Sequence, residues 1–232
     1  MFENTVKRFS LFEISLLAAK FTAKAISQKN PSEKFFLSLP GGSTPSLYFK
    51  ILANRPELKQ HWHRVMVFQG DERFLPPSSP LLNSRLIQKS FISQFNSNPP
   101  DFFKINTNVQ SPQEAATAYQ KIISEHLPAT PDGLPAFDLT VLGIGTDGHV
   151  ASLFPNSPAF TQNSNFFLNV PPPTTCEPFV ERLTMTIPAI NNSKLKLFLL
   201  SGRDKLELLE KPKKSLPFSL ITNPFFFASI HR

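Results

Sequence analysis

Residues Leu139–Pro155 read LTVLGIGTDGHVASLFP. A short apolar run, Leu139–Leu142, stops at a segment in which glycines surround Asp147 and His149, and residues compatible with a helix, Val150–Leu153, follow. The pattern predicts a strand, a tight glycine turn and then the start of a helix. This order places an imidazole at the mouth of a loop, where free N–H groups of the helix start can meet an anion or a developing oxyanion.

The same stretch contains a literal G-x-G-x-x-G pattern at Gly143–Gly148, which is typical of dinucleotide-binding proteins. Its context disfavours that interpretation, because the motif lies past mid-chain and no Asp or Glu occurs between Asp147 and Glu177 to bind a ribose about 20 residues on. No histidine spacing indicates a metal site either. We therefore predict no cofactor and no metal.

Three further apolar runs share the character of Leu139–Leu142, namely Phe35–Leu39, Val65–Phe68 and Leu195–Leu200. Helical patterns separate the four runs, and the expected helices are Ser10–Ser27, Ser46–Ala53, Asn83–Phe91, Pro112–His126 and Leu206–Glu210. Apolar strands that alternate with helices predict a Rossmann-like α/β fold, with a parallel sheet and helices on both faces. Arg182–Ile187 and Phe225–Ile230 are expected as additional strands, residues 156–171 as irregular chain, and residues 1–232 as one domain.

Each of the four apolar runs leads directly into a polar loop. The loops carry Gly41-Gly42-Ser43-Thr44, Asp71-Glu72-Arg73, the segment with His149, and Ser201-Gly202-Arg203-Asp204-Lys205. Ligands of open parallel sheets bind at the carboxyl ends of the strands, so we expect the four loops to converge on one site.

Each candidate residue has an ordinary alternative. Gly41–Thr44 suits a phosphate, and it equally suits a glycine turn with a Ser or Thr helix cap. Lys205 and Arg182 either bind a ligand or are ordinary surface charges. Asp71 and Arg73 either line a binding site or belong to a solvated charged turn. His149 is the acid–base candidate, because imidazole titrates near neutrality and the other histidines lack this glycine setting.

Composition limits the classes of function. The chain has 232 residues with 41% hydrophobic and 18% charged residues, which is an ordinary globular balance. The net charge of +7 comes from scattered residues without a nucleic-acid-binding motif, so it fits a basic surface or a small phosphorylated substrate better than nucleic acid. Cys176 is the only cysteine, which excludes an internal disulfide. No signal pattern and no apolar segment of about 20 residues is found, so a soluble cytoplasmic protein without a membrane is expected.

Taken together, the loop motifs resemble a known family. The motifs are LPGGSTPSLY (39–48), GDERFLPP (70–77), GIGTDGHVASLFP (143–155), RLTMTIPAIN (182–191) and SGRDK (201–205), and in this order they resemble 6-phosphogluconolactonases. The GGSTP motif alone is shared with the related glucosamine-6-phosphate deaminases. The resemblance covers nearly the whole chain and implies a Rossmann-like fold of the NagB/RpiA/CoA transferase type.

The resemblance also implies a reaction and a set of roles. The reaction is hydrolysis of 6-phosphogluconolactone to 6-phosphogluconate in the oxidative pentose phosphate pathway, without metal or cofactor, by a chain that we expect to be a monomer. His149 would be the general base, and Asp71 and Arg73 would line the sugar end. The expected phosphate-binding residues are Gly41, Gly42, Ser43, Thr44, Arg182 and Lys205.

Two alternatives to a lactonase stay open. A deaminase resembles this chain, but its pattern has Asp-Glu-Tyr at Asp71–Arg73 and Asn-Glu-Pro at Leu153–Pro155, so a carboxylate that its chemistry needs is missing here. A sugar-phosphate sensor without catalysis is the second alternative. The loop Ser78–Leu82 departs from the lactonase pattern, in which acidic residues and histidine are usual, and this departure concerns the shape of that rim and not the chemistry.

Overall fold

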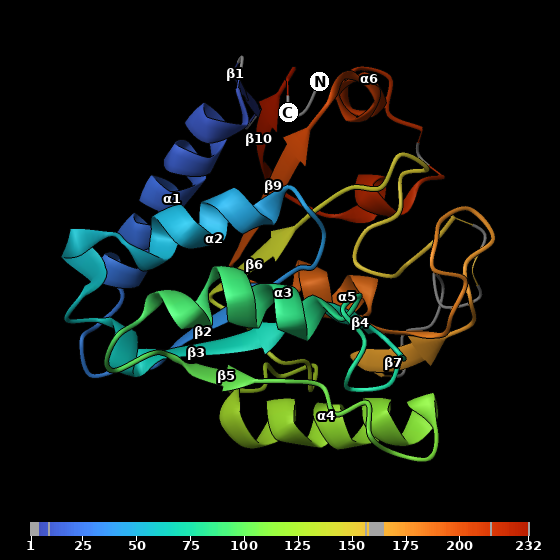
Figure 1. Cartoon of the computed structure of the whole chain (residues 1–232), viewed down its shortest axis with the longest axis horizontal. Coiled ribbons are helices and arrows are strands. Elements are labelled where there is room, and N and C mark those ends of the chain that lie inside the picture. The colour runs from blue at the N-terminus through green and yellow to red at the C-terminus, as the bar shows by residue number, and fades with distance from the viewer. Residues whose placement is uncertain (1–4, 9, 156, 158–164, 214, 232) are drawn as a thin grey trace.

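The computed structural model of the chain describes residues 5–8, 10–155, 157, 165–213 and 215–231 (Figure 1). Its main element is a seven-stranded sheet with the order β1-β10-β9-β6-β2-β3-β5, in which every pairing is parallel. The strands are β1 (Thr5–Arg8), β2 (Phe35–Leu39), β3 (Val65–Gln69), β5 (Asp101–Phe103), β6 (Leu139–Leu142), β9 (Leu195–Ser201) and β10 (Phe225–Ser229). The predicted α/β class and parallel sheet are confirmed.

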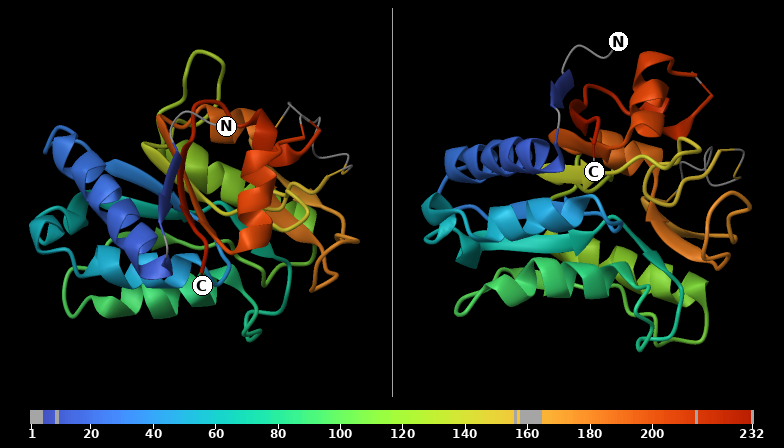
Figure 2. Two further views of the ribbon diagram at one scale, coloured as in Figure 1. Left: turned by 90° about the horizontal axis from the view of Figure 1, so that it is seen from above. Right: turned by 45° about the horizontal axis from the view of Figure 1, so that its top comes forward.

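A second, smaller sheet lies beside the first. It has three antiparallel strands in the order β4-β8-β7, which are β4 (Asp71–Arg73), β8 (Arg182–Met185) and β7 (Phe167–Val170). The strand β4 follows β3 after a single residue, Gly70, so the chain passes directly from the large sheet into the small one. The small sheet lies on the side of the molecule away from α1 (Leu11–Gln28), as Figures 1 and 2 show.

The remaining helices are α2 (Pro45–Ala53), α3 (Asn83–Ser90), α4 (Pro112–His126), α5 (Ile187–Asn191) and α6 (Arg203–Glu210), with short 3₁₀ turns at Pro56–Leu58, Trp62–Arg64, Ile92–Gln94 and Pro217–Leu220. Local capping explains where the long helices begin. The hydroxyl of Ser10 accepts the N–H of Glu13, and that of Ser111 accepts the N–H of Glu114. The carboxylate of Glu114 reaches back to the N–H of Gln110 instead of Ser111, so only half of a capping box forms at α4.

Alternate strand residues supply two separate cores. Phe35, Leu37 and Leu39 of β2 face α1, α2 and α3, whereas Phe36 faces the other side, where α4, α5, α6 and the small sheet pack. Because both faces are covered, the strands are apolar throughout rather than alternating. Burying a side chain of this size contributes about 1.5–3 kcal/mol, and most of these are fully buried.

Most expected elements are present, and three expectations are wrong. Asp71–Arg73, expected in a loop, forms the strand β4. Val150–Leu153 does not start a helix. Ala151 has a φ of 50°, and Val150 and Leu153 form an isolated antiparallel bridge, so the chain turns back on itself. Of the stretch expected to be irregular, residues 156 and 158–164 lie outside the described residues. Within the remainder β7 is a regular strand, because it gains backbone partners from β8. No described helix is long and apolar enough to span a bilayer.

Candidate active site

The central strands splay apart at the place where the chain direction across the sheet reverses. The strands β2 and β6 pair over only two registers, Leu37 with Leu139 and Ser38 with Thr140, although both strands continue beyond them. From β2 the chain moves outward to β3, and from β6 it moves outward in the opposite direction to β9. Such a switch point opens a crevice at the carboxyl ends of the strands.

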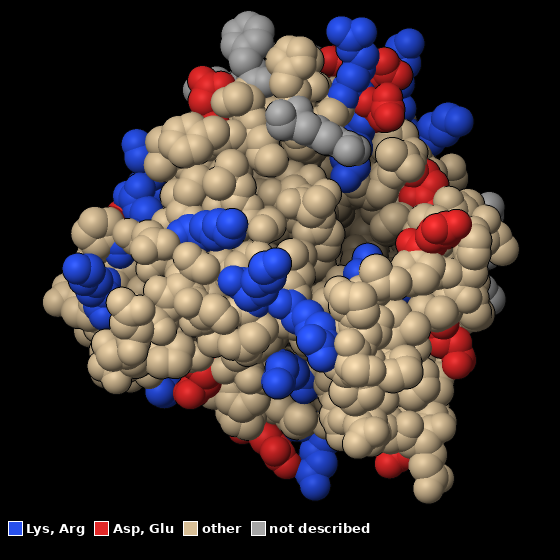
Figure 3. Space-filling view, in the orientation of Figure 1, with Lys and Arg blue, Asp and Glu red and all other residues tan. Residues whose placement is uncertain are grey.

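A pocket of about 240 Å³ occupies this crevice. Figure 3 shows the face of the molecule hollowed, with basic and acidic side chains near the hollow. The lining residues come from all four predicted loops and are Pro40, Gly41, Gly42, Ser43, Thr44, Pro45, Asp71, Arg73, Asn83, Gly143, Ile144, Gly145, His149, Ala151, Leu199 and Lys205. The structure therefore brings eight of the nine predicted site residues together, and Arg182 is the one that does not line the pocket.

His149 is held by its own glycine loop. The N–H of Gly145 donates to the carbonyl of His149 at 2.9 Å, which closes the loop. A Cβ added to Gly145 would lie 2.1 Å from Nδ1 of His149, so glycine is needed at this position for the imidazole to lie against the backbone. Gly148 has a φ of 86°, a left-handed conformation that glycine adopts without strain. The ring of Phe154, 4.7 Å away between centroids, packs against the imidazole.

Asp147 orients the imidazole. Its Oδ1 lies 2.6 Å from Nδ1 of His149 and also accepts the backbone N–H of His149, while its Oδ2 accepts the hydroxyl of Thr175. Burial opposes ionisation of Asp147, but the hydrogen bonds from His149 and Thr175 outweigh it and hold the pKa of this carboxyl well below its ordinary value. An ionised Asp147 makes Nδ1 the proton-bearing nitrogen, so Nε2 is left to accept a proton.

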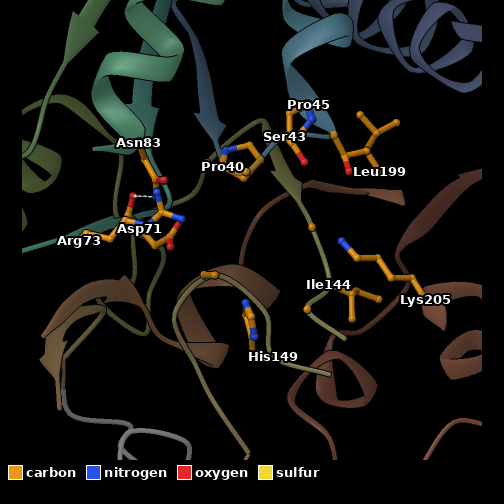
Figure 4. Close-up of a pocket in the computed structure, with 16 residues that line it drawn as sticks. Pro40, Ser43, Pro45, Asp71, Arg73, Asn83, Ile144, His149, Leu199 and Lys205 are labelled. Atoms are coloured by element: carbon orange, nitrogen blue, oxygen red, sulfur yellow. Dashed lines mark hydrogen bonds between the residues drawn. The ribbon is translucent and has the colours of Figure 1, made fainter. Parts of the chain in front are cut away.

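The strand β4 places the carboxylate of Asp71 and the guanidinium of Arg73 on the wall of the pocket opposite Lys205 (Figure 4). Asp71 is nearly buried, and its Oδ2 accepts the hydroxyl of Ser152 at 2.8 Å. Ser152 belongs to the turn that replaces the expected helix, so this bond ties the His149 loop to Asp71. The guanidinium of Arg73 donates to the carbonyl of Leu81, which holds the rim loop against β4.

Glu72, between those two residues, faces inward and has a structural role. It is fully buried, and its carboxylate accepts four N–H groups, from the backbone of Arg73, Asn83 and Ser84 and from the Gln69 side chain. Burial raises the pKa of Glu72, and these four donors act in the opposite direction. Two of the donors are the first N–H groups of α3, so Glu72 fixes the start of that helix.

The turn Gly41–Thr44 leads into α2 and forms the third wall. Gly42 has a φ of 89° and is exposed, and Pro45 occupies the first helical position. Thr44 is the N-cap residue of α2, and its side chain makes no cap bond to the helix, so the alternative of a hydroxyl cap is not seen at Thr44. Lys205 lies in the first turn of α6 and reaches into the pocket from the side across from Asp71 and Arg73 (Figure 4). Backbone N–H groups at a helix start together with an ammonium suit a phosphate.

Arg182 lies behind this arrangement. It pairs with Arg73 across β8 and β4, is 3% exposed, and donates from Nη2 to the carbonyl of Pro178 at 2.6 Å. Its Nη1 is buried without a hydrogen-bond partner. Burial and the neighbouring Arg73 lower the pKa of Arg182. A contact of Arg182 with a ligand stays a prediction.

The sequence interpretation missed several residues that shape the site. Asp147 carried one signal, an acid two residues before a histidine in a glycine loop. Ser152 carried none, because its segment was expected to be helical. Asn83 lies ten residues beyond Arg73, and only the fold brings it to the pocket. No three His, Cys, Asp or Glu side chains in the described ranges are grouped as metal ligands. This arrangement suits acid–base catalysis at His149, next to a turn whose N–H groups are suited to an anion.

Comparison with known proteins agrees with this geometry. The model of the family described as glucosamine-6-phosphate isomerases/6-phosphogluconolactonase matches residues 13–224, and the chain belongs to this family. A 6-phosphogluconolactonase of Synechocystis is 32% identical over 186 residues, covering 80% of this chain and 73% of that protein. One from Treponema pallidum is 30% identical over 221 residues, covering 92% and 89%. The solved structure of a Trypanosoma brucei 6-phosphogluconolactonase has a TM-score of 0.87 at 22% identity, covering 99% of this chain and 97% of that chain, and shows the shared fold.

Proposed function

We propose that this chain hydrolyses 6-phosphogluconolactone to 6-phosphogluconate, the lactonase step of the pentose phosphate pathway, and that His149 is the general base. The activity follows from membership of the family and from the relatives at 30–32% identity. The observation that carries the mechanism is the bond of 2.6 Å between His149 Nδ1 and Asp147 Oδ1 at the edge of a pocket that also holds Arg73 and Lys205.

In the proposed reaction, Nε2 of His149 takes a proton from a water molecule while the water oxygen bonds to the lactone carbonyl carbon. The carbonyl oxygen becomes an oxyanion, and Arg73 is the proposed group that stabilises it. The intermediate collapses by breaking the bond to the ring oxygen, which receives the proton from His149. One water is consumed, and the products are a carboxylic acid and a free hydroxyl. General acid–base catalysis of this kind contributes about 10²–10⁴ in rate.

Asp147 supports this role in two ways. It keeps the proton on Nδ1, so that Nε2 faces the reaction as a base, and its charge stabilises the imidazolium that forms. Asp71 is proposed to contact the sugar hydroxyls, because its carboxylate is fixed by Ser152 and lines the pocket. Asp71 lies on the wall opposite Lys205, away from the end of the pocket at which we propose that the phosphate binds.

The substrate phosphate is assigned to the other end of the pocket. Gly41, Gly42, Ser43 and Thr44 offer backbone N–H groups and hydroxyls, and Lys205 offers a positive charge. Arg182 is proposed as a further contributor of positive charge from behind Arg73, which its unpartnered Nη1 supports. We further propose a monomeric enzyme of one domain, and gel filtration tests the oligomeric state.

The test is turnover by the purified protein. The wild type should accelerate acid release from freshly prepared 6-phosphogluconolactone, and His149→Gln should remove at least about 10²-fold of kcat while still binding 6-phosphogluconate. The exposed His63 gives a matched control, since His63→Gln should retain full activity. Absence of acceleration by the wild type would refute the proposal.

Two other activities are distinguished by the same samples. The family also contains glucosamine-6-phosphate isomerases, so release of ammonia from glucosamine 6-phosphate would indicate that chemistry. Binding of 6-phosphogluconate without any turnover would indicate a sensor. The pair of His149 with an ionised Asp147 favours the enzyme over the sensor, because binding alone does not require an oriented base.

A further inference from the structure

Asn83 is a buried pocket residue to which neither the motifs nor the mechanism assigns a role. It is the first residue of α3 and is 2% exposed. Its backbone N–H donates to Glu72 at 2.7 Å, and its side-chain Nδ2 donates to the carbonyl of Asp71 at 3.1 Å (Figure 4). Because Nδ2 must face that carbonyl, the orientation of the carboxamide is fixed, and Oδ1 faces the other way.

The Oδ1 atom of Asn83 lies against the Gly41–Thr44 turn. A Cβ built on Gly41 would be 1.8 Å from Oδ1 and 2.1 Å from Cγ of Asn83. The φ of Gly41 is outside the left-handed region, whereas Gly42 has a φ of 89° with nothing within 4 Å of its added Cβ. The two glycines are therefore needed for different reasons: Gly42 for its conformation, and Gly41 for the room that Asn83 occupies.

The contact has a further unusual property. Oδ1 of Asn83 is buried and has no hydrogen-bond partner. A buried acceptor without a partner is unfavourable and is rare in native structures, so its presence calls for an explanation. The geometry joins the Asp71 strand, the start of α3 and the Gly41 turn at one side chain.

We propose that Asn83 is a positioning residue, which holds the Gly41–Thr44 turn at a fixed distance from Asp71 and the His149 loop. The kinetic part of this inference rests on the proposed function. A substrate whose phosphate lies in the turn presents its carbonyl to His149 only if that distance is correct, and a displacement of about 1 Å can cost about 10²-fold in rate. Asn83 itself does not touch the reacting atoms.

The first test is Asn83→Ala, which removes the carboxamide but keeps the backbone bond to Glu72. We expect kcat to fall at least about 10-fold, while the Kd for 6-phosphogluconate changes less than about three-fold, because the turn itself is intact. Assays are run well below the Tm of each variant so that all of the protein is folded. Ser84→Ala is the matched control, since Ser84 is the neighbouring residue of α3, faces away from this pocket and keeps its own backbone bond to Glu72.

A second variant keeps the test decisive if Asn83→Ala does not fold. Asn83→Asp preserves the shape of the side chain but replaces the Nδ2 donor by an oxygen that faces the carbonyl of Asp71. It should lower kcat in the same way. A folded Asn83→Ala or Asn83→Asp protein with kcat within about two-fold of the wild type overturns the proposal.

A double-mutant cycle tests the contact independently of catalysis. Gly41→Ala alone should lower both Tm and kcat, because its Cβ meets Oδ1. In the double variant Gly41→Ala/Asn83→Ala the Tm should be higher than in Gly41→Ala, because the obstructing carboxamide is gone, and the two effects on kcat should not multiply. Additive losses of Tm and kcat would overturn the proposal. If the wild type shows no lactonase turnover, the proposed function fails, and the Tm cycle still decides whether the contact exists.

Discussion

Replacing Asp147 separates the two things that this carboxylate does for His149. Asp147→Asn keeps an oxygen that can accept from the imidazole, so the ring orientation is retained and only the charge is lost. Two unit charges about 4 Å apart interact by about 4 kcal/mol at the effective dielectric of a protein surface. Both side chains are partly exposed, at 19% and 23%, and the charge on the imidazole is only partly developed in the transition state. We therefore take about half of that energy, which lowers kcat by about 30-fold.

Asp147→Ala removes orientation as well as charge and should cost about 10³-fold, within the range of general-base catalysis. The assay is initial acid release from fresh 6-phosphogluconolactone, with the uncatalysed rate subtracted and the lactone well above KM. Asp132→Asn is the control, because it removes an exposed charge outside the pocket, and it should leave kcat unchanged. A kcat for Asp147→Ala above about one third of wild type would refute the role of this pair.

Four further outcomes are expected. Lys205→Ala should raise KM about 10–100-fold with kcat little changed, because the free energy of a hydrogen bond to a charged group corresponds to a factor of this size. The substitution Lys211→Ala, at an exposed residue, should leave both KM and kcat unchanged. Gly145→Ala places a Cβ 2.1 Å from the imidazole and should lower kcat at least about 10²-fold, as measured in the same assay. Asp138→Ala removes a buried carboxylate that two lysines and a backbone N–H share at the amino end of the sheet, and should lower the free energy of unfolding in urea by about 3 kcal/mol without changing kcat. Because the folded-state pKa of Asp147 is lowered, its ionised form adds stability above its unfolded pKa of about 3.9, and the stability difference between wild type and Asp147→Asn should shrink as the pH falls below that value.

The central part of the fold was predictable, because its strands are apolar on both faces. The runs Phe35–Leu39 and Leu139–Leu142 coincide with β2 and β6, and Pro112–His126 coincides with α4, where a capping serine and a proline mark the start. The short strand β4 was not predictable, because it consists of three charged residues and depends on pairing with β8. Strand preference there is set by tertiary partners and not by the residues themselves.

The convergence of the loops was predictable from strand order alone, but the contacts among them were not. The helix expected after Gly148 is replaced by a turn in which Ala151 adopts a left-handed conformation that alanine disfavours. That turn delivers Ser152 to Asp71, a contact over 81 positions that no local pattern encodes. The role of Asn83 is likewise set by three-dimensional proximity to Gly41.

The register of β1 has a consequence for how the polypeptide matures. Thr5 pairs with Phe226 and Arg8 with Ser229, so β1 borders a strand that is synthesised much later. Its neighbour in the sheet is made more than 200 residues later, and at synthesis rates of about 5–20 residues per second the strand waits at least about ten seconds for a partner. The edge of β9 is also uncovered from its own synthesis until β10 is made, since β10 lies between β9 and β1 in the sheet. Nascent chains stalled before Phe225 should therefore depend on chaperones more than the finished protein does.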